Sequence, residues 1–160
     1  MVKNIVKNNK TKTSKIKVVY FFLLGFILLF LDQLTKFFIF RFVSIGERIT
    51  IIPGFLWFSN VHNTGASFGI LQNSNAPLVY LYIMVFGLMI FFYDYFKSSL
   101  ERISYVLFMS GLLGNLLDRF IHGFVVDFID LGWWPVFNVA DSCLVIGVIL
   151  LIIAEFTTKK

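Results

Sequence analysis

The sequence predicts an all-α membrane protein in which four transmembrane helices carry a small extracytoplasmic β-element. Three observations support this fold class. Of the 160 residues, 58% are hydrophobic and 14% are charged, whereas soluble domains are about half apolar and about a quarter charged. Four segments are apolar over about 20 residues, the length that crosses a bilayer. The longest connection between them is rich in Ile, Phe and Trp and is interrupted by Pro53-Gly54.

The four expected spans are residues 18–40, 77–96, 103–121 and 139–156. We expect the first span to be retained, because it is longer than the apolar core of a cleavable signal peptide and contains Asp32 and Lys36. An even number of crossings places both termini on one side of the membrane.

The basic residues predict which side that is. Six lysines lie in residues 1–17, Lys97 and Arg102 lie in the second connection, and the chain ends in Lys159-Lys160. Because cytoplasmic loops are enriched in Lys and Arg, we expect both termini to be cytoplasmic. Residues 1–17 are then a basic tail without fixed structure, and residues 18–157 form a single membrane domain. The net charge of +5 is a topology signal, so no nucleic-acid partner is expected.

The connection of residues 41–76 is expected to lie outside the membrane. Its apolar stretch, residues 49–58, predicts short strands or a hairpin on the membrane surface. Trp57, Trp133 and Trp134 fit the aromatic belt of the outer interface. Ordinary packing explains each of these tryptophans equally well.

The composition excludes several other classes of protein. Disorder is incompatible with 21 Phe, 6 Tyr and 3 Trp. Cys143 is the only cysteine, so it cannot form an internal disulfide, and His62 and His122 make no zinc pattern. We therefore expect no metal and no other cofactor.

Polar side chains gather at one end of the predicted bundle. The first and third spans run outward and the fourth runs inward, so their polar ends meet near the outer interface. These residues are Asp32, Lys36, Asn115, Asp118, Arg119, Asn138 and Asp141, and Asp127 lies at the same level. Because unpaired charges in hydrocarbon are costly, such a cluster indicates a functional site.

The spacing of these residues predicts local contacts. Asp32 and Lys36 are four residues apart on one helix face, which favours a supporting ion pair. Gly111 and Gly114 are expected to let a neighbouring helix approach closely. Asn138 is placed to cap the fourth helix.

Two carboxylates held close together share a proton, so one acts as a base while the other acts as an acid. Such a pair can activate water against an amide carbonyl. Asp127 and Asp141 are the candidates, and Asp130 competes with Asp127 by proximity. A purely structural ion-pair network is the alternative interpretation of the cluster.

Five short motifs follow one another along the chain. They are Asp32-Gln-Leu-Thr-Lys36, Asn63-Thr-Gly-Ala-Ser-Phe-Gly69, Gly114-Asn115-Leu-Leu-Asp118-Arg119, Val125-Val-Asp127-Phe and Phe137-Asn138-Val-Ala-Asp141-Ser142. In this order, on a chain with four spans, they resemble the motif set of lipoprotein signal peptidase, the type II signal peptidase of bacteria.

The resemblance implies an aspartyl endopeptidase of the bacterial cytoplasmic (inner) membrane. Such enzymes remove the signal peptide from diacylglyceryl-modified prolipoproteins and cleave before the lipid-modified cysteine. The expected partners are these precursors and membrane lipid, and the expected oligomeric state is a monomer.

The resemblance also implies roles for individual residues. Asp127 and Asp141 would be the catalytic pair, which resolves the choice between Asp127 and Asp130. The site would be lined by Asn63, Asn115, Arg119 and Asn138, with Asp32 and Lys36 as the supporting pair near the outer face. A small sheet would be built largely from residues 41–76. The stretch between the two aspartates, with Gly132-Trp-Trp-Pro135, is shorter than is common in the family.

Two other functions compete with this interpretation. Gly65-Ala-Ser67-Phe-Gly69 spells the nucleophile-elbow pattern of serine hydrolases, with His62 or His122 as a possible base. That pattern needs a large α/β sheet, which this chain has no room to build. A small transporter or channel would use the carboxylates as an ion path, but the polar groups gather at only one membrane face.

Overall fold

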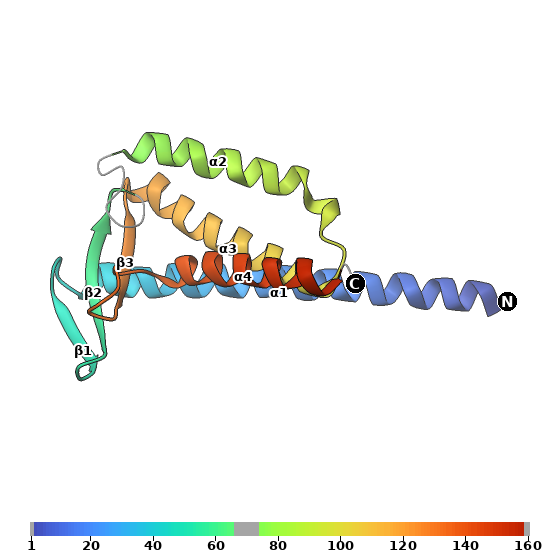
Figure 1. Ribbon diagram of the computed structural model, residues 1–160, viewed down its shortest axis with the longest axis horizontal. Helices are drawn as coiled ribbons and strands as arrows, with labels where there is room; N and C mark the ends of the chain where they lie inside the picture. Colours follow the sequence, from blue (N-terminus) through green and yellow to red (C-terminus); the bar gives the residue numbers. More distant parts are fainter. Residues whose placement is uncertain (1, 66–73, 159–160) are drawn as a thin grey trace.

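The computed structural model describes residues 2–65 and 74–158, and it describes side chains for residues 19–65 and 74–157. The described chain is mostly helical, with a small sheet at one end of the helices (Figure 1). In chain order the elements are α1 (Val2–Phe42), β1 (Arg48–Ile52), β2 (Leu56–Asn63), α2 (Asn75–Phe91), the short 3-10 helix η2 (Tyr93–Tyr95), α3 (Ser99–His122), β3 (Val125–Asp130) and α4 (Val139–Thr158).

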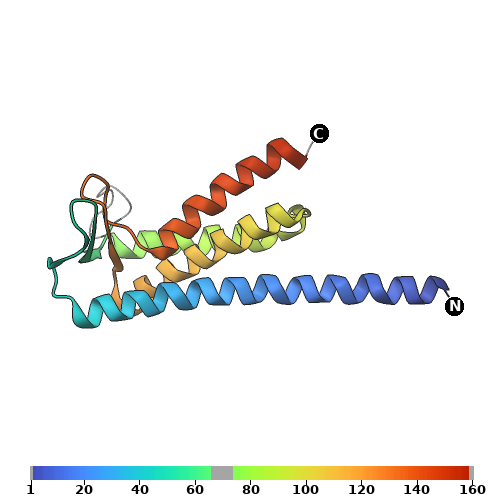
Figure 2. The same cartoon turned by 90° about the horizontal axis from the view of Figure 1, so that it is seen from below.

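The first helix is longer than predicted. It begins at Val2, so the basic segment that we expect to lack fixed structure continues the helix instead. Lysine is a good helix former, and a helix extends more readily than it nucleates. Figure 2 shows this end of α1 running past the other helices, on the side away from the sheet.

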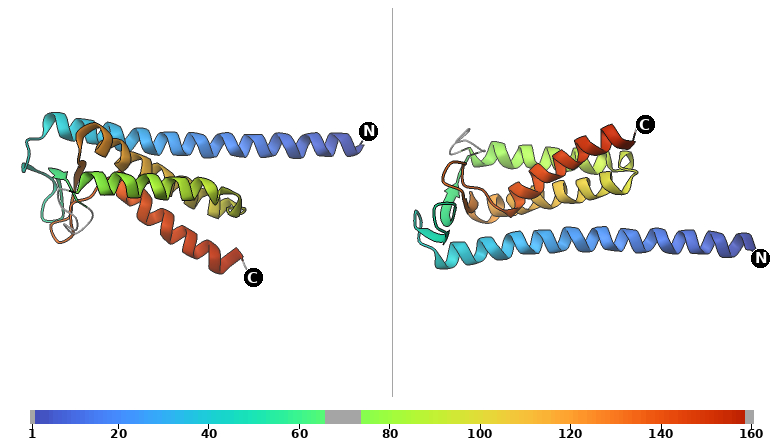
Figure 3. Two further views of the ribbon diagram at one scale, coloured as in Figure 1. Left: turned by 90° about the horizontal axis from the view of Figure 1, so that it is seen from above. Right: turned by 60° about the horizontal axis from the view of Figure 1, so that its bottom comes forward.

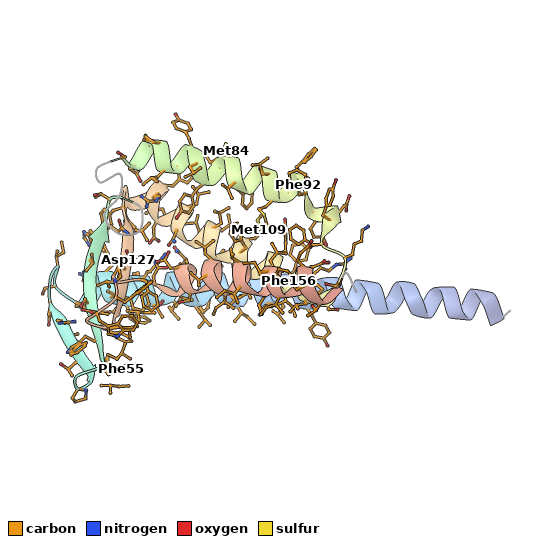
Figure 4. The ribbon with its side chains drawn as sticks, in the orientation of Figure 1. Phe55, Met84, Phe92, Met109, Asp127 and Phe156 are labelled. Atoms are coloured by element: carbon orange, nitrogen blue, oxygen red, sulfur yellow. The ribbon has the colours of Figure 1, made fainter. Side chains whose placement is uncertain are left out.

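Two of the described helices are long and apolar enough to cross a membrane, namely Val19–Phe42 and Val139–Thr157. The apolar helix Asn75–Phe91 is shorter. The third expected span, α3, carries charged residues at both ends and a polar last turn, which lower its hydropathy. Four crossings therefore stay a prediction. Exposed apolar side chains, including Met84, Phe92 and Phe156, cover the helices (Figure 4).

Helix α3 lies at the centre of the fold, in contact with α1, α2 and α4, while α1 runs alongside the group (Figure 3). The predicted close approach at Gly111 and Gly114 is confirmed. A Cβ atom at Gly111 would collide with the carbonyl oxygen of Ala140 in α4, and one at Gly114 would lie 2.5 Å from Asp32 Oδ2 in α1. Gly147 of α4 is similarly tight against the α3 backbone.

The sheet has three antiparallel strands in the order β1-β2-β3. Residues 41–76 supply the predicted hairpin of β1 and β2, but the third strand comes from the connection between α3 and α4. Val61 pairs with Asp127 and Asn63 pairs with Val125. The sheet is thus a joint product of both connections, and it places the first candidate aspartate beside the end of β2.

The segment that follows β3 folds back onto it. Ile129 and Phe137 form an isolated antiparallel bridge, with backbone N–H···O distances of 2.7 and 3.1 Å. The bridge closes residues 131–136 into a loop. Helix α4 begins soon after Phe137, so the hydrogen bonds of the bridge hold the two ends of the loop together.

A small core joins the sheet to the C-terminal end of α1. Ile39 of α1 and Val43, which directly follows this helix, pack against Val126 and Phe128 of β3, and all four are buried. Because successive side chains of a strand point to opposite faces, Asp127 faces away from this core. The packing of its two neighbours therefore fixes the direction of the aspartate.

We predict that Gly111→Ala destabilises the protein by about 1–3 kcal/mol, because the added methyl group meets backbone atoms of α4 that have no room to move. Thermal unfolding of the purified protein in detergent measures the effect. Gly87→Ala in α2 is the matched control, since nothing lies within 4 Å of its Cβ position and alanine favours helix. Equal melting temperatures for the two variants would contradict the close contact.

Candidate active site

A small cavity of about 80 Å³ lies where the sheet meets the helices. Asp127 and Asp141 both line it, from β3 and from the first turn of α4. Figure 4 shows Asp127 at this junction. The other lining residues are Asn63, Gly65, Leu78, Tyr82, Asn115, Arg119 and Val125. Two carboxylates from different elements therefore share one cavity.

Asp127 is held by two side-chain amides. Its Oδ1 accepts a hydrogen bond from Asn138 Nδ2 at 2.6 Å, and its Oδ2 accepts one from Asn63 Nδ2 at 2.9 Å. Asn63 reaches the carboxylate from the neighbouring strand, near the point where β2 ends. Both oxygens are thus fixed by neutral donors.

Asp141 is held in a similar way. Its Oδ1 accepts from Asn115 Nδ2 at 2.7 Å, and its Oδ2 accepts from the backbone N–H of Asn138 at 3.2 Å. Asn138 Oδ1 in return accepts from the backbone N–H of Asp141 at 2.8 Å. This reciprocal pair is a capping box, so the predicted cap is confirmed. Asn138 contacts both aspartates.

Behind the cavity lies a buried ion-pair network. Lys36 Nζ is 2.9 Å from Asp32 Oδ2, which confirms the predicted pair, and 3.1 Å from Asp118 Oδ2. The same ammonium donates to Asn115 Oδ1 at 2.9 Å. The amide group of Asn115 therefore lies between Lys36 and Asp141.

The two acids of this network also bind backbone. Asp32 Oδ1 accepts from the N–H of Ala140 at 2.7 Å, at the start of α4, and Asp118 Oδ2 accepts from the N–H of Val126 at 3.0 Å, in β3. Gln33 Nε2 donates to both carboxylates. The network consequently fixes the two elements that carry Asp127 and Asp141.

Arg119 is buried at the wall of the cavity. It donates hydrogen bonds to the carbonyl oxygen of Gly65 and to Asn75 Oδ1, and its guanidinium lies 5.6 Å from the ring centroid of Tyr82. Its Nε has no partner among the described residues. The terminal nitrogens of Arg119 thus fix the orientation of its side chain.

Asp130, the competing candidate, belongs to a different cluster. Its carboxylate pairs with Arg48 Nε at 2.7 Å and accepts from Ser59 Oγ at 3.1 Å. Partial burial raises the pKa of Asp130, but the hydrogen bonds from Arg48, Gly132 and Ser59 outweigh it and leave the pKa below its ordinary value. Asp130 is therefore a structural anion outside the cavity.

The pKa of Asp127 is shifted in the opposite direction to that of Asp130. Burial, and then the negative charge of Asp141, raise the pKa of Asp127 to about 7, although the amides of Asn63 and Asn138 lower it in part. The side chain is therefore distributed between its acid and its base form at neutral pH. Groups with this property are suited to proton transfer.

The structure brings most of the predicted residues to the cavity. Asn63, Asn115, Arg119, Asp127 and Asp141 line it, Asn138 binds both aspartates, and Asp32 and Lys36 lie behind it. Ser67 and Gly69 of the nucleophile-elbow pattern lie outside the described residues.

Sequence reasoning missed the contributions of α2. Leu78 and Tyr82 line the cavity, and Asn75 bonds Arg119. In the sequence Leu78 and Tyr82 belong to an apolar span and Asn75 belongs to the preceding connection, and only their spacing of three to four residues places them on one face. His62 and His122 are absent from the cavity lining, and both rings pack around Phe124. Among the described residues, no group of three or more His, Cys, Asp or Glu side chains is arranged to hold a metal ion.

Comparison with known proteins gives consistent results. The family model described as "Signal peptidase (SPase) II" matches residues 24–157. A lipoprotein signal peptidase of Staphylococcus carnosus is 43% identical over 139 residues, covering 82% of this chain and 87% of the relative. The corresponding protein of Moorella thermoacetica is 41% identical over 133 residues, covering 82% and 89%.

Solved structures agree with this similarity. A bacterial membrane enzyme determined by the in meso method at 2.3 Å resolution superposes with a TM-score of 0.84 at 34% identity, covering 89% of this chain and 93% of that chain. A second one, at 1.9 Å resolution, gives a TM-score of 0.79 at 34% identity, covering 88% and 94%.

We predict that Asp127 makes stability depend on pH. Because its pKa in the folded protein is above the ordinary value of 3.8, the protonated form stabilises the fold, and this stabilisation is lost as the pH rises toward about 7. The free energy of unfolding should fall by up to about 4 kcal/mol over this range. Denaturation of the purified protein at a series of pH values measures the decline.

The Asp127→Ala variant should be less stable at low pH, and its stability should decline much less with rising pH. Asp94→Ala, which removes an exposed acid far from the cavity, is the control and should keep the decline of the unmodified protein. A decline of the same size in Asp127→Ala would show that another group causes it.

Proposed function

The chain belongs to the signal peptidase II family and is a protease that removes signal peptides from prolipoproteins; we propose that it does so as an aspartyl endopeptidase with Asp127 and Asp141 as the catalytic pair. The substrate is a diacylglyceryl-modified precursor, and cleavage occurs before the lipid-modified cysteine. One observation carries the assignment: the two carboxylates line one cavity and accept hydrogen bonds from neutral amides, and Asn138 donates to both of them.

The mechanism needs one proton on the pair. Two acids in one poorly hydrated space do not ionise together, so one is protonated while the other is a base. The base removes a proton from a water molecule, and the water oxygen bonds to the scissile carbonyl carbon. The acid then protonates the leaving amine as the carbon–nitrogen bond breaks. The proton belongs to the pair rather than to one residue.

The neighbouring residues position the reacting groups. Asn63, Asn115 and Asn138 orient the carboxylates but cannot take the proton, because amide groups do not titrate in this range. Arg119 lies at the wall of the cavity with its guanidinium held by Gly65 and Asn75, where it can donate to a carbonyl oxygen of the substrate backbone. Lys36 lies behind Asn115 and lowers the energy of the negative charge that the pair carries.

The chain is an integral membrane protein, and we propose four crossings with both termini in the cytoplasm. The N-terminus and the C-terminus both lie at the end of the molecule away from the sheet (Figure 1). The basic residues of the tail and of the α2–α3 connection lie at that end as well. In this orientation the sheet and the catalytic cavity lie near the outer face of the cytoplasmic membrane.

The arrangement of the helices suggests how the substrate enters. Residues of α2 and α4 both line the cavity, but among the described residues these two helices contact α3 and not each other. We propose that the signal helix enters sideways between α2 and α4, which brings the peptide bond next to Asp141 at the outer end of α4. The lipid chains of the precursor remain in the bilayer.

Replacing either catalytic aspartate by asparagine should lower the rate of cleavage by at least about 100-fold, because an amide can neither accept nor donate the transferred proton. Cleavage of a diacylglyceryl-modified precursor by the purified protein in detergent measures this loss. Melting temperatures and elution profiles show whether each variant is folded.

Two control variants sharpen the assignment. Asp130→Asn changes an acid on the same strand as Asp127, and Ser67→Ala removes the hydroxyl group of the nucleophile-elbow pattern. Both should keep most of the activity. A folded Asp127→Asn or Asp141→Asn variant with full activity would refute the catalytic pair, and an inactive but folded Ser67→Ala variant would favour a serine mechanism.

We further predict that the diacylglyceryl-modified precursor is cleaved much faster than the same precursor with an unmodified cysteine. The lipid anchors the substrate in the bilayer and aligns the scissile bond with the cavity, which raises its effective concentration. Parallel assays with the two precursors measure the ratio. Equal rates would show that the enzyme recognises the peptide alone.

A further inference from the structure

Among the described residues that line the catalytic cavity, Tyr82 alone carries a hydroxyl group. It lies on α2, one turn after Leu78, which also lines the cavity and is buried. Residues four apart share one face of a helix, so the ring of Tyr82 lies on the face that meets α3. Tyr80 of the same helix is 72% exposed and does not line the cavity.

The hydroxyl oxygen of Tyr82 has two side-chain partners. It is hydrogen-bonded to Asn115 and to Arg119, which both belong to α3. The guanidinium carbon of Arg119 also lies 5.6 Å from the centroid of the tyrosine ring. A guanidinium group has donors and no acceptor. The oxygen of Tyr82 therefore accepts the hydrogen bond that it shares with Arg119.

The contacts of Asn115 fix the direction of the other hydrogen bond. Its Oδ1 accepts from Lys36 Nζ at 2.9 Å and from Asn138 Nδ2 at 3.2 Å. Because an ammonium group only donates, the atom next to Lys36 is the amide oxygen, and these two bonds use both of its lone pairs. Asn115 thus meets Tyr82 as a donor as well, through its Nδ2. Neither bond uses the O–H hydrogen of Tyr82, which is left to donate into the cavity.

The proposed reaction needs a donor of this kind. When the water oxygen bonds to the scissile carbonyl carbon, the carbonyl oxygen becomes negatively charged, and a donor aimed at it lowers the barrier. The carboxylates bind the water and the leaving amine, and the amides of Asn63 and Asn115 donate to those carboxylates. Tyr82 stands beside Arg119 at another part of the cavity wall.

We propose that Tyr82 is a further catalytic residue, whose O–H group donates a hydrogen bond to the scissile carbonyl oxygen as this oxygen becomes negatively charged. The proton stays on the tyrosine throughout, because a phenol is a much weaker acid than the carboxylic acid that protonates the leaving amine. The positive charge of Arg119 favours the same oxygen. This inference rests on the proposed aspartyl mechanism and adds to it a donor from α2.

The Tyr82→Phe variant tests the hydroxyl group alone, since it keeps the ring that faces Arg119. We expect kcat for the diacylglyceryl-modified precursor to fall about 100-fold, as for the loss of one donor to a developing oxyanion, with KM nearly unchanged. Tyr80→Phe makes the same change on the exposed face of the same helix and should keep full activity. Melting temperatures show that both variants are folded. A normal kcat in folded Tyr82→Phe would overturn the proposal.

Two inhibitors separate a donor from a residue that only positions its neighbours. A lipopeptide with a difluoroketone in place of the scissile amide binds as the hydrate, whose two oxygens imitate the tetrahedral intermediate. The corresponding difluoroalcohol keeps only the oxygen that the carboxylates bind. Displacement of a fluorescent lipopeptide measures both affinities. Tyr82→Phe should bind the ketone about tenfold more weakly and the alcohol as well as the unmodified protein does. Equal losses would make Tyr82 a positioning residue and refute the proposed contact, as would no loss for either inhibitor.

The aspartate variants separate this inference from the proposed function. If Asp127→Asn is inactive while folded Tyr82→Phe has a normal kcat, the assignment of Tyr82 fails alone and the catalytic pair stands. If folded Asp127→Asn keeps full activity, the catalytic pair itself is refuted, whatever the tyrosine variant shows.

Discussion

The burial of Lys36 is the constraint on which the rest of the structure depends. An ammonium group inside a helix bundle is stable only when anions and hydrogen-bond acceptors surround it. Asp32, Asp118 and Asn115 meet this requirement, and they come from α1 and α3. Their remaining oxygen atoms hold the first turn of α4 and the start of β3. A single charge thus links α1, α3, β3 and α4, and the glycines of α3 leave the space in which the helices meet.

This arrangement separates two kinds of acid that are close in space. Asp32 and Asp118 contact the ammonium group directly and serve as its counter-ions. Asp127 and Asp141 contact amides instead, so no cation fully compensates their charge. The first pair stabilises the fold as anions, and the second pair is left with a proton to exchange. The difference depends on which groups the carboxylates touch rather than on the depth at which they lie.

Much of the site could be predicted from the sequence, because polar residues in apolar spans are costly and leave few arrangements. The ion pair of Asp32 and Lys36, the cap at Asn138 and the close helices at Gly111 follow from spacing alone. Tyr82 could not be recognised, because one aromatic residue in an apolar helix resembles any other. The strand β3 could not be predicted either, because its pairing with β2 depends on contacts between segments far apart in the chain.

The bridge between Ile129 and Phe137 separates the loop of residues 131–136 from the segments that carry the carboxylates. Because this pair holds the two ends of the loop together, changes within residues 131–136 need not displace the strand and the helix that carry Asp127 and Asp141. Insertions or deletions within this loop would leave the positions of the two carboxylates unchanged. The loop with Trp133 and Trp134 can therefore differ in length among relatives while Asp127 and Asp141 keep their places.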